Sequence, residues 1–175
     1  MPDTNKEGPS KGYPALRRGR VSVSHADYFL TVCARRPCAR LADPPLRKVI
    51  MGRQLELEAA ALWTVRCSAL MPDHLHLLVT LHTDTSLSNA VREFKGPLTP
   101  ALRLADVSWQ PGFYDHRVRM HDDLFAVFLY IFLNPYRAGL CGTAEVWPGY
   151  YCCPNDWSWF GAMTKESRPE PDWLR

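Results

Sequence analysis

The sequence lacks the features that mark membrane and secreted proteins. Its longest apolar run, residues 124–133, is too short for a helix that crosses a bilayer, which takes about 20 residues. Residues 1–10 are polar and carry Asp3, Lys6 and Glu7, so no secretory signal opens the chain. We therefore expect a cytoplasmic protein that makes no membrane contact.

The cysteines lack the spacing of a zinc or redox motif. No two of them form a Cys-x-x-Cys pattern, which zinc ribbons and thioredoxin-like sites use. Cys67 falls on the apolar face of a predicted strand, where a buried thiol is the expected role. Reduced thiols are the simplest interpretation for such a protein. The six are Cys33, Cys38, Cys67, Cys141, Cys152 and Cys153.

Neither sign of charge dominates. The 175 residues carry 21 Lys and Arg against 18 Asp and Glu, a net charge of +3. This balance permits a polyanionic partner without requiring one. The length suits one domain with a proper core, and we expect a flexible basic arm over 1–24, a domain over 25–142 and a Trp- and Pro-rich tail over 143–175 that packs on the domain without regular structure.

The most informative segment is the strand predicted over residues 74–81. Alternate side chains of a strand share a face, so Leu75, Leu77, Val79 and Leu81 would form a wholly apolar face. The opposite face would present His74 and His76, two imidazoles close enough to share a metal ion. Alternatively, the two histidines are ordinary solvent-exposed side chains of the strand, and their spacing alone does not decide between these interpretations.

Periodicity places further elements around this strand. Strands are predicted over 28–33, 63–71 and part of 109–120, and helices over 44–61, with Leu46, Val49, Ile50 and Leu57 as its apolar stripe, and over 86–104, capped by Ser86. A last helix begins at Asp122 or Asp123 and ends at Asn134, because Pro135 follows. A three-residue turn at 72–74 would pair Met71 with Leu75 and Ala69 with Leu77. The order predicts an α+β fold with a ferredoxin-like antiparallel sheet, helices packed on one face and the histidines on the uncovered face.

Tyr130 and Asn134 stand four residues apart near the end of that last helix. Residues at this spacing share a helix face, so a phenol and an amide oxygen can approach one metal together. Oxygen ligands suit Mg²⁺ or Mn²⁺, and tyrosine is a known covalent nucleophile. Tyr114 and Tyr136 are rival nucleophiles, and core packing for Tyr130 and a helix stop for Asn134 also remain open.

Three ordered segments resemble a known family. Residues 71–79, MPDHLHLLV, resemble the HUH motif of single-tyrosine transposases, in which U is a bulky apolar residue. Residues 109–119, WQPGFYDHRVR, and 130–140, YIFLNPYRAGL, are similar to the segment before their nucleophile helix and to that helix with its exit. The closest similarity is to the REP-associated tyrosine transposases, over about residues 26–142. Asp73 stands where asparagine is common and Tyr136 where a small aliphatic residue is usual.

The resemblance implies a fold of the HUH endonuclease type and a reaction. His74, His76 and Asn134 would bind a divalent metal, Mg²⁺ or Mn²⁺. Tyr130 would attack a DNA phosphate, form a 5′-phosphotyrosine link and free a 3′-hydroxyl. Because the covalent bond keeps the energy of the cleaved phosphodiester, rejoining needs no nucleotide cofactor. The substrate would be single-stranded DNA beside a hairpin, such as a repetitive extragenic palindrome (REP), and the protein would act at the nucleoid as a monomer or a homodimer.

Basic side chains are expected to hold the DNA through phosphate contacts, with base stacking on aromatic rings. Two other functions stay open: a domesticated protein that binds hairpins without cutting, and a zinc- or iron-dependent enzyme for small molecules. RNA as substrate is also open. The expected DNA-binding residues are Arg17, Arg18, Arg20, Arg35, Arg36, Arg66, Lys95, Arg117, Arg119 and Arg137.

Overall fold

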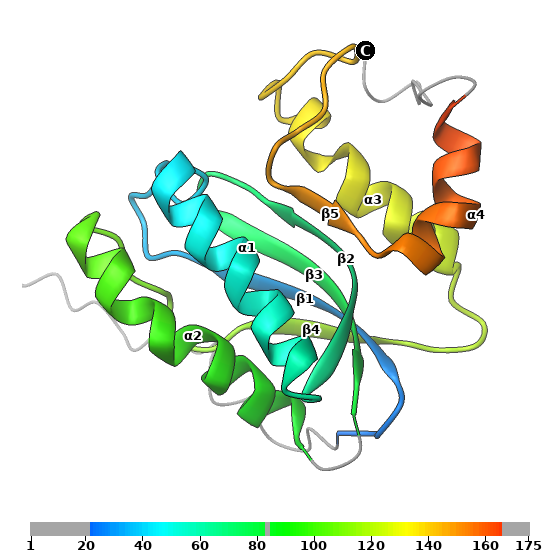
Figure 1. Cartoon of the computed structure of the whole chain (residues 1–175), viewed down its shortest axis with the longest axis horizontal. Coiled ribbons are helices and arrows are strands. Elements are labelled where there is room, and N and C mark those ends of the chain that lie inside the picture. The colour runs from blue at the N-terminus through cyan, green and yellow to red at the C-terminus, as the bar shows by residue number, and fades with distance from the viewer. Residues whose placement is uncertain (1–21, 83–84, 166–175) are drawn as a thin grey trace, which may run out of the picture.

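Alternating apolar residues build an antiparallel sheet in the strand order β4-β1-β3-β2-β5, seen at the centre of the computed structural model in Figure 1. The structure describes residues 22–82 and 85–165, and side chains up to residue 161. The first four strands have the ferredoxin-like order, which confirms the predicted fold class. The elements are β1 (Asp27–Cys33), α1 (Pro44–Ala59), β2 (Trp63–Leu70), β3 (His74–Leu81), α2 (Leu87–Leu104), β4 (Tyr114–Val118), α3 (Leu124–Arg137), β5 (Tyr150–Cys152) and α4 (Pro154–Lys165).

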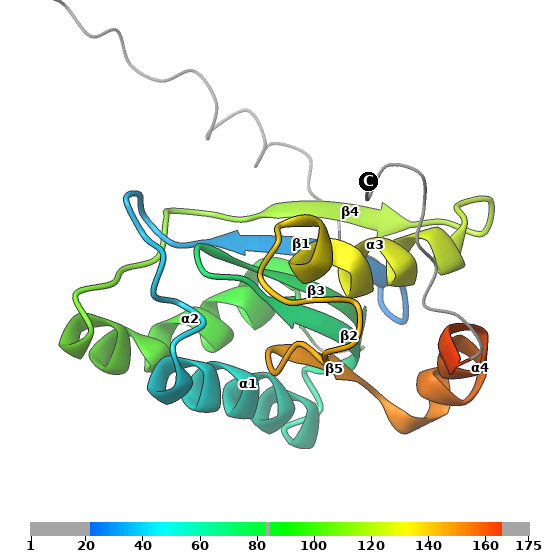
Figure 2. The ribbon, with the colours of Figure 1, turned by 90° about the horizontal axis from the view of Figure 1, so that it is seen from above.

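The first face of the sheet carries the larger core. Leu75, Leu77, Val79 and Leu81 of β3 are fully buried there, as the alternation predicted. Helices α1 and α2 cover this face (Figure 2). Ser86 caps α2 as expected, since its side chain accepts a hydrogen bond from the Asn89 amide. In α1 the prediction for Val49 was wrong: it is exposed, and Gln54 is buried in its place along the stripe.

The second face is not left open, because α3 packs across it (Figure 2). Leu78 of β3 is buried there against Phe128, Ile131 and Phe132 of α3. The expectation that helices lie on one face only was therefore wrong in this respect. A helix made largely of apolar residues has to be buried, and α3 is such a helix. Its placement brings the α3 side chains to the histidine face.

The hairpin between β2 and β3 is shifted by one residue from the predicted register. Leu70 pairs with Leu75 and Ala69 pairs with His76, and Met71 donates its amide hydrogen to the carbonyl of His74. The turn therefore contains two residues, 72 and 73, instead of three. An irregularity between Val65 and Cys67 then restores Val65 to the first face, as a β-bulge does when it adds one residue to a strand.

Helix α3 continues past Pro135 to Arg137, so the predicted end at Asn134 was wrong. The helix ends instead where Gly139 adopts a positive φ of 66°. The Leu140 amide donates to the Pro135 carbonyl and the Gly139 amide donates to the Tyr136 carbonyl. This is the glycine-based helix end that satisfies terminal carbonyls, and it overrides the local preference of the residue before proline.

The Trp-rich tail is regular, contrary to expectation. β5 joins the sheet beside β2, and α4 follows it. Phe160 of α4 is buried against Phe128 and Phe132 of α3. The folded unit therefore extends beyond residue 142. None of the helices in the described part of the chain has the length and apolarity that a membrane span requires.

Candidate active site

Two imidazoles meet on the second face of the sheet. The Nε2 atoms of His74 and His76 lie 3.0 Å apart. His74 Nδ1 is 2.6 Å from a carboxylate oxygen of Asp73, and His76 Nδ1 is 3.0 Å from the Thr31 hydroxyl. Because a carboxylate only accepts, Nδ1 of His74 carries a proton and donates it to Asp73, and Nε2 is left to face His76. Neighbouring groups thus orient both rings toward one point.

Burial keeps the second imidazole neutral. His76 is 4% exposed. Burial, and then the neighbouring His74, lower the pKa of His76 to about 3, while Asp73 opposes the shift. A neutral imidazole is the form that binds metals. His76 therefore offers a neutral donor at neutral pH.

The donor set fits a divalent cation. A histidine ligand commonly donates its second ring N–H to a carboxylate, which orients the ring and raises its basicity, and Asp73 makes this contact with His74. Among the described residues, no third His, Cys, Asp or Glu joins the pair to complete a protein-only cage. The remaining positions therefore suit an amide oxygen, substrate phosphate and water, as Mg²⁺ usually has.

Helix α3 places a tyrosine beside this pair. The ring centroid of Tyr130 is 5.3 Å from that of His76 and 5.7 Å from that of Phe29 on β1. Tyr130 is 40% exposed, so a substrate can reach it. The Arg137 guanidinium lies 5.7 Å from the same ring. A phenol, two imidazoles and a cation thus come together from β3 and α3.

Asn134 follows one turn after Tyr130, as its spacing predicts. Its side-chain amide nitrogen donates to the Tyr130 carbonyl at 3.1 Å. The amide oxygen of Asn134 does not take part in this hydrogen bond. This contact ties the two residues together on one side of α3, and the role of Asn134 as a metal ligand stays a prediction.

The rival tyrosines occupy different surroundings. Tyr136 is 8% exposed and its hydroxyl donates to the Glu145 carbonyl at 2.9 Å. Tyr114 is 50% exposed on β4. Its register partner is Thr31, which in turn pairs with His76 across β1 and β3. Tyr114 is therefore accessible, but strand β1 separates it from the imidazoles. Of these three tyrosines, Tyr130 alone has a ring contact with one of the two histidines.

Comparison with known proteins decides the family. The chain is 33% identical over 137 residues to a REP-associated tyrosine transposase of Escherichia coli (strain K12), covering 74% of this chain and 78% of the relative. The chain belongs to the REP-associated tyrosine transposase family. No family model matches the sequence. The fold is similar to that of a REP-associated tyrosine transposase bound to a REP hairpin, with a TM-score of 0.65, 24% identity and coverage of 75% of this chain and 79% of that one.

Five of the basic residues expected to contact DNA are exposed around this transposase fold. Arg36 lies 3.9 Å from Asp73, beside the imidazole pair, and Arg137 lies over Tyr130. Their DNA contacts stay predictions. Arg17, Arg18 and Arg20 lie outside the described residues. The exposed residues are Arg35, Arg36, Arg117, Arg119 and Arg137.

Two of the residues expected to contact DNA have partners within the protein, and their DNA contacts stay predictions. Arg66 forms ion pairs with Asp156 at 2.6 Å and Asp27 at 2.7 Å. Lys95 donates to the carbonyls of Gln110 at 2.6 Å and Gly112 at 2.9 Å. Their charged groups bind the protein itself, which sequence could not reveal because the partners of Arg66 are 39 and 90 residues away.

Sequence reasoning assigned no role to three residues that shape the site of this family member. Thr31, Phe29 and Asp73 contact the histidines from β1 and the turn before β3. Only Asp73 had a local signal, because it directly precedes His74. Thr31 and Phe29 become visible only through the pairing of β1 with β3.

Proposed function

We propose that this protein is a metal-dependent endonuclease and strand transferase of the HUH type, acting on single-stranded DNA next to hairpins. The observation that carries the proposal is the contact between the exposed ring of Tyr130 and the buried, neutral His76. The related structure with a REP hairpin supports hairpin DNA as the partner. Such a protein would act in the cytoplasm at the nucleoid.

In this mechanism Tyr130 is the nucleophile. Its phenol gives up its proton, and the oxygen attacks the scissile phosphorus to form a 5′-phosphotyrosine link to the DNA on the 3′ side of the break. The bond from phosphorus to the 3′ oxygen breaks, and that oxygen leaves as a hydroxyl that takes a proton. Attack by a 3′-hydroxyl on the phosphotyrosine reverses these steps and joins the strands without a nucleotide cofactor.

The imidazoles, with Asn134, would hold Mg²⁺ or Mn²⁺ at the scissile phosphate. A bound cation would neutralise the charge that develops on the phosphate oxygens. His76 contributes a rigid, dry ligand, since Thr31 and Phe29 fix its ring. Arg137, over the ring of Tyr130, would contact the DNA backbone beside the nucleophile.

Trapping the covalent intermediate tests the proposal. A hairpin oligonucleotide labelled on its 3′ side, incubated with Mn²⁺, should yield a denaturant-resistant adduct with the protein. Tyr130→Phe should abolish the adduct, at least a roughly 10³-fold loss, because no other nucleophile replaces it. Tyr114→Phe is the matched control, since it removes another exposed phenol, on β4, and this variant should still form the adduct.

The outcomes separate the alternatives. An adduct that persists in Tyr130→Phe and disappears in Tyr114→Phe would transfer the nucleophile to β4. Hairpin binding without any adduct in Mg²⁺ or Mn²⁺ would favour a domesticated binding protein. No DNA binding together with tightly held zinc would favour an enzyme for small molecules.

A further inference from the structure

Four groups of the active site form one chain of short contacts. A carboxylate oxygen of Asp73 lies 2.6 Å from Nδ1 of His74, whose Nε2 lies 3.0 Å from Nε2 of His76. Nδ1 of His76 lies 3.0 Å from the hydroxyl oxygen of Thr31. These are hydrogen-bond distances, so each contact needs one proton between its two atoms. The positions of these protons decide which nitrogen atoms can bind a cation.

The contacts fix the protons of the imidazole pair. The carboxylate of Asp73 can only accept, so His74 donates from Nδ1. A neutral imidazole has a single N–H, so in the neutral pair Nε2 of His74 accepts and Nε2 of His76 donates. Nδ1 of His76 then accepts from the Thr31 hydroxyl. In this arrangement a proton covers the nitrogen of His76 that faces His74.

A cation between the two rings requires a different arrangement in His76. Nε2 binds a metal through its lone pair, so the single proton of the neutral ring has to be on Nδ1. The ring is 4% exposed, and a buried N–H without an acceptor is costly. The Thr31 hydroxyl faces Nδ1, and a hydroxyl can accept as well as donate. Thr31 therefore suits both arrangements of His76, whereas the carboxylate of Asp73 suits only one arrangement of His74.

The packing of His76 opposes a flip of its ring, which would be the other way to exchange the two nitrogens. The ring centroids of Phe29 and Tyr130 each lie 5.3 Å from that of His76. Close-packed neighbours of this kind hold a buried side chain in one orientation. The change in His76 is therefore a change in the position of its proton, and the ring stays in place.

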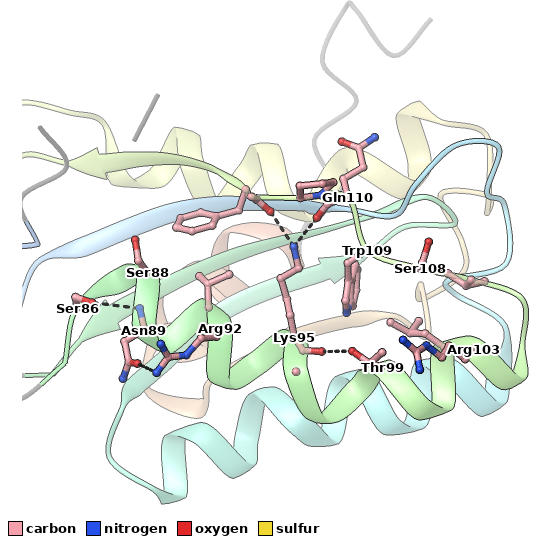
Figure 3. A pocket seen from close by; sticks show the side chains of 17 residues that line it. Ser86, Ser88, Asn89, Arg92, Lys95, Thr99, Arg103, Ser108, Trp109 and Gln110 are labelled. Atoms are coloured by element: carbon pink, nitrogen blue, oxygen red, sulfur yellow. Dashed lines mark hydrogen bonds between the residues drawn. The ribbon is translucent and has the colours of Figure 1, made fainter. Parts of the chain in front are cut away.

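The backbone of Thr31 is also held in place. Thr31 lies directly opposite His76 in the register of β1 with β3, and β4 pairs with β1 on the other side. Lys95 fastens the segment before β4, because it donates to the carbonyls of Gln110 and Gly112 (Figure 3). The response open to Thr31 is thus a rotation of its hydroxyl hydrogen about the C–O bond.

We propose that Thr31 is a positioning residue that lets His76 accept the cation of the active site. This proposal rests on the function proposed above. On binding, the proton on Nε2 of His76 passes to water and a proton from water joins Nδ1, so the ring keeps its charge. The Thr31 hydroxyl turns from donor to acceptor and holds the new N–H. Asp73 keeps His74 in one tautomer, whereas Thr31 makes the tautomer of His76 adjustable.

The tautomer of His76 in the unmodified protein tests this proposal. Long-range ¹H–¹⁵N NMR spectra of the full chain, labelled with ¹⁵N-histidine, report which ring nitrogen carries the proton. Spectra are recorded at about pH 8, above the usual imidazole pKa of about 6.5, without Mg²⁺ and with saturating Mg²⁺. The signals of His76 are those that His76→Gln removes. We expect the proton on Nε2 without Mg²⁺ and on Nδ1 with it, and the same tautomer in both spectra overturns the proposal.

Threonine variants give a second test, measured by calorimetric titration with Mn²⁺. Thr31→Val keeps the shape of the side chain but leaves the Nδ1–H of the loaded site without an acceptor. Its Mn²⁺ affinity should fall about 10-fold, the low end of the range for loss of a supporting group. Thr31→Ser keeps the hydroxyl and should keep most of the affinity. Thr64→Val is the matched control, since it removes a hydroxyl that contacts His82 at 2.9 Å, and its affinity should equal that of the unmodified protein.

The other outcomes separate this proposal from the proposed function. Equal Mn²⁺ affinity in Thr31→Val and the unmodified protein overturns the role of Thr31. An equal loss in Thr31→Ser and Thr31→Val also overturns it, because the loss would then not follow the hydroxyl. Failure of the unmodified protein to bind either Mn²⁺ or Mg²⁺ overturns this proposal and the metal-dependent function together, whereas metal binding without a change of tautomer overturns this proposal alone.

Discussion

Two polar clusters lie at opposite ends of the same sheet face and differ in how completely their groups are paired. At the first, the imidazole cluster, His74 and His76 face each other through Nε2. At the second, the arginine cluster, Arg66 bridges Asp27 and Asp156. His76 and Thr80, which donates to Asp27, are four residues apart on β3, or about 13 Å.

The arginine cluster is saturated. Each nitrogen of the Arg66 guanidinium donates to a carboxylate oxygen, twice to Asp156 and once to Asp27. Asp156 also accepts from Cys153 and the Trp159 indole. Hydrogen bonds to Asp156 first, and the two negative charges as well, raise the pKa of Arg66 against the effect of burial. This cluster fastens α4 to the sheet, and its charges are paired within the protein.

The imidazole cluster is unsaturated. The Nε2 atoms of the two imidazoles face one another, and neighbouring groups fix both rings in that direction. Two converging imidazoles of this kind suit a metal cation as their shared partner. The comparison teaches that the arginine cluster, whose charges are paired, serves stability. The imidazole cluster, whose nitrogen atoms converge, is the candidate site of chemistry.

The largest expected effect comes from removing one imidazole. His76→Gln keeps a polar side chain but removes a good metal ligand, so DNA cleavage in Mg²⁺ should fall at least roughly 10³-fold. The free energy of unfolding, measured in urea, should fall only by about 1 kcal/mol, the worth of the hydrogen bond to Thr31. EDTA should lower DNA cleavage by the unmodified protein to the same extent. Cleavage that survives both changes would contradict the metal role.

Arg66 should show the reverse pattern. Arg66→Met leaves two carboxylates without a partner, so the free energy of unfolding should fall by about 3 kcal/mol. Arg66→Lys keeps the charge but loses the paired hydrogen bonds, and its loss should be smaller. Cleavage per folded molecule should change little. A large fall in cleavage with unchanged unfolding would show that this cluster takes part in the reaction.

The sequence predicts the active face well because its signals are local. Alternation along 74–81 identifies the buried side of β3, and helical spacing puts Tyr130 and Asn134 on one side of α3. The register of β2 could not be predicted, since Cys67, Ala69 and Leu70 are all buried and alternation does not reveal the extra residue of a bulge. The ion pairs of Arg66 could not be predicted either, because its carboxylate partners are distant in sequence.

Asp73 should have an intermediate effect. It orients His74, so Asp73→Ala should weaken Mn²⁺ binding about 10- to 100-fold, as loss of such a supporting carboxylate typically does. Asp73→Asn keeps an acceptor oxygen for His74 Nδ1, and we expect most of the affinity to remain. Calorimetric titration with Mn²⁺ measures both variants. Equal affinity in all three proteins would mean that Asp73 does not orient the ligand.

The smallest effect concerns acid stability of the arginine cluster. Burial would raise the pKa of Asp156, but hydrogen bonds from Arg66, Cys153 and Trp159 outweigh it and hold that pKa below its usual value. A carboxylate with a lowered pKa stabilises the fold above its unfolded pKa of about 4, and this contribution is lost as the pH falls below that value. The difference in unfolding free energy between the unmodified protein and Arg66→Met should therefore narrow from pH 5 to pH 3, as measured by urea titration. Asp156→Asn should show less narrowing against its own Arg66→Met double variant, because Asp27 is then the only one of the two carboxylates left beside Arg66. If the difference in unfolding free energy between the unmodified protein and Arg66→Met stays constant from pH 5 to pH 3, the ion pair does not contribute to the loss of stability in acid.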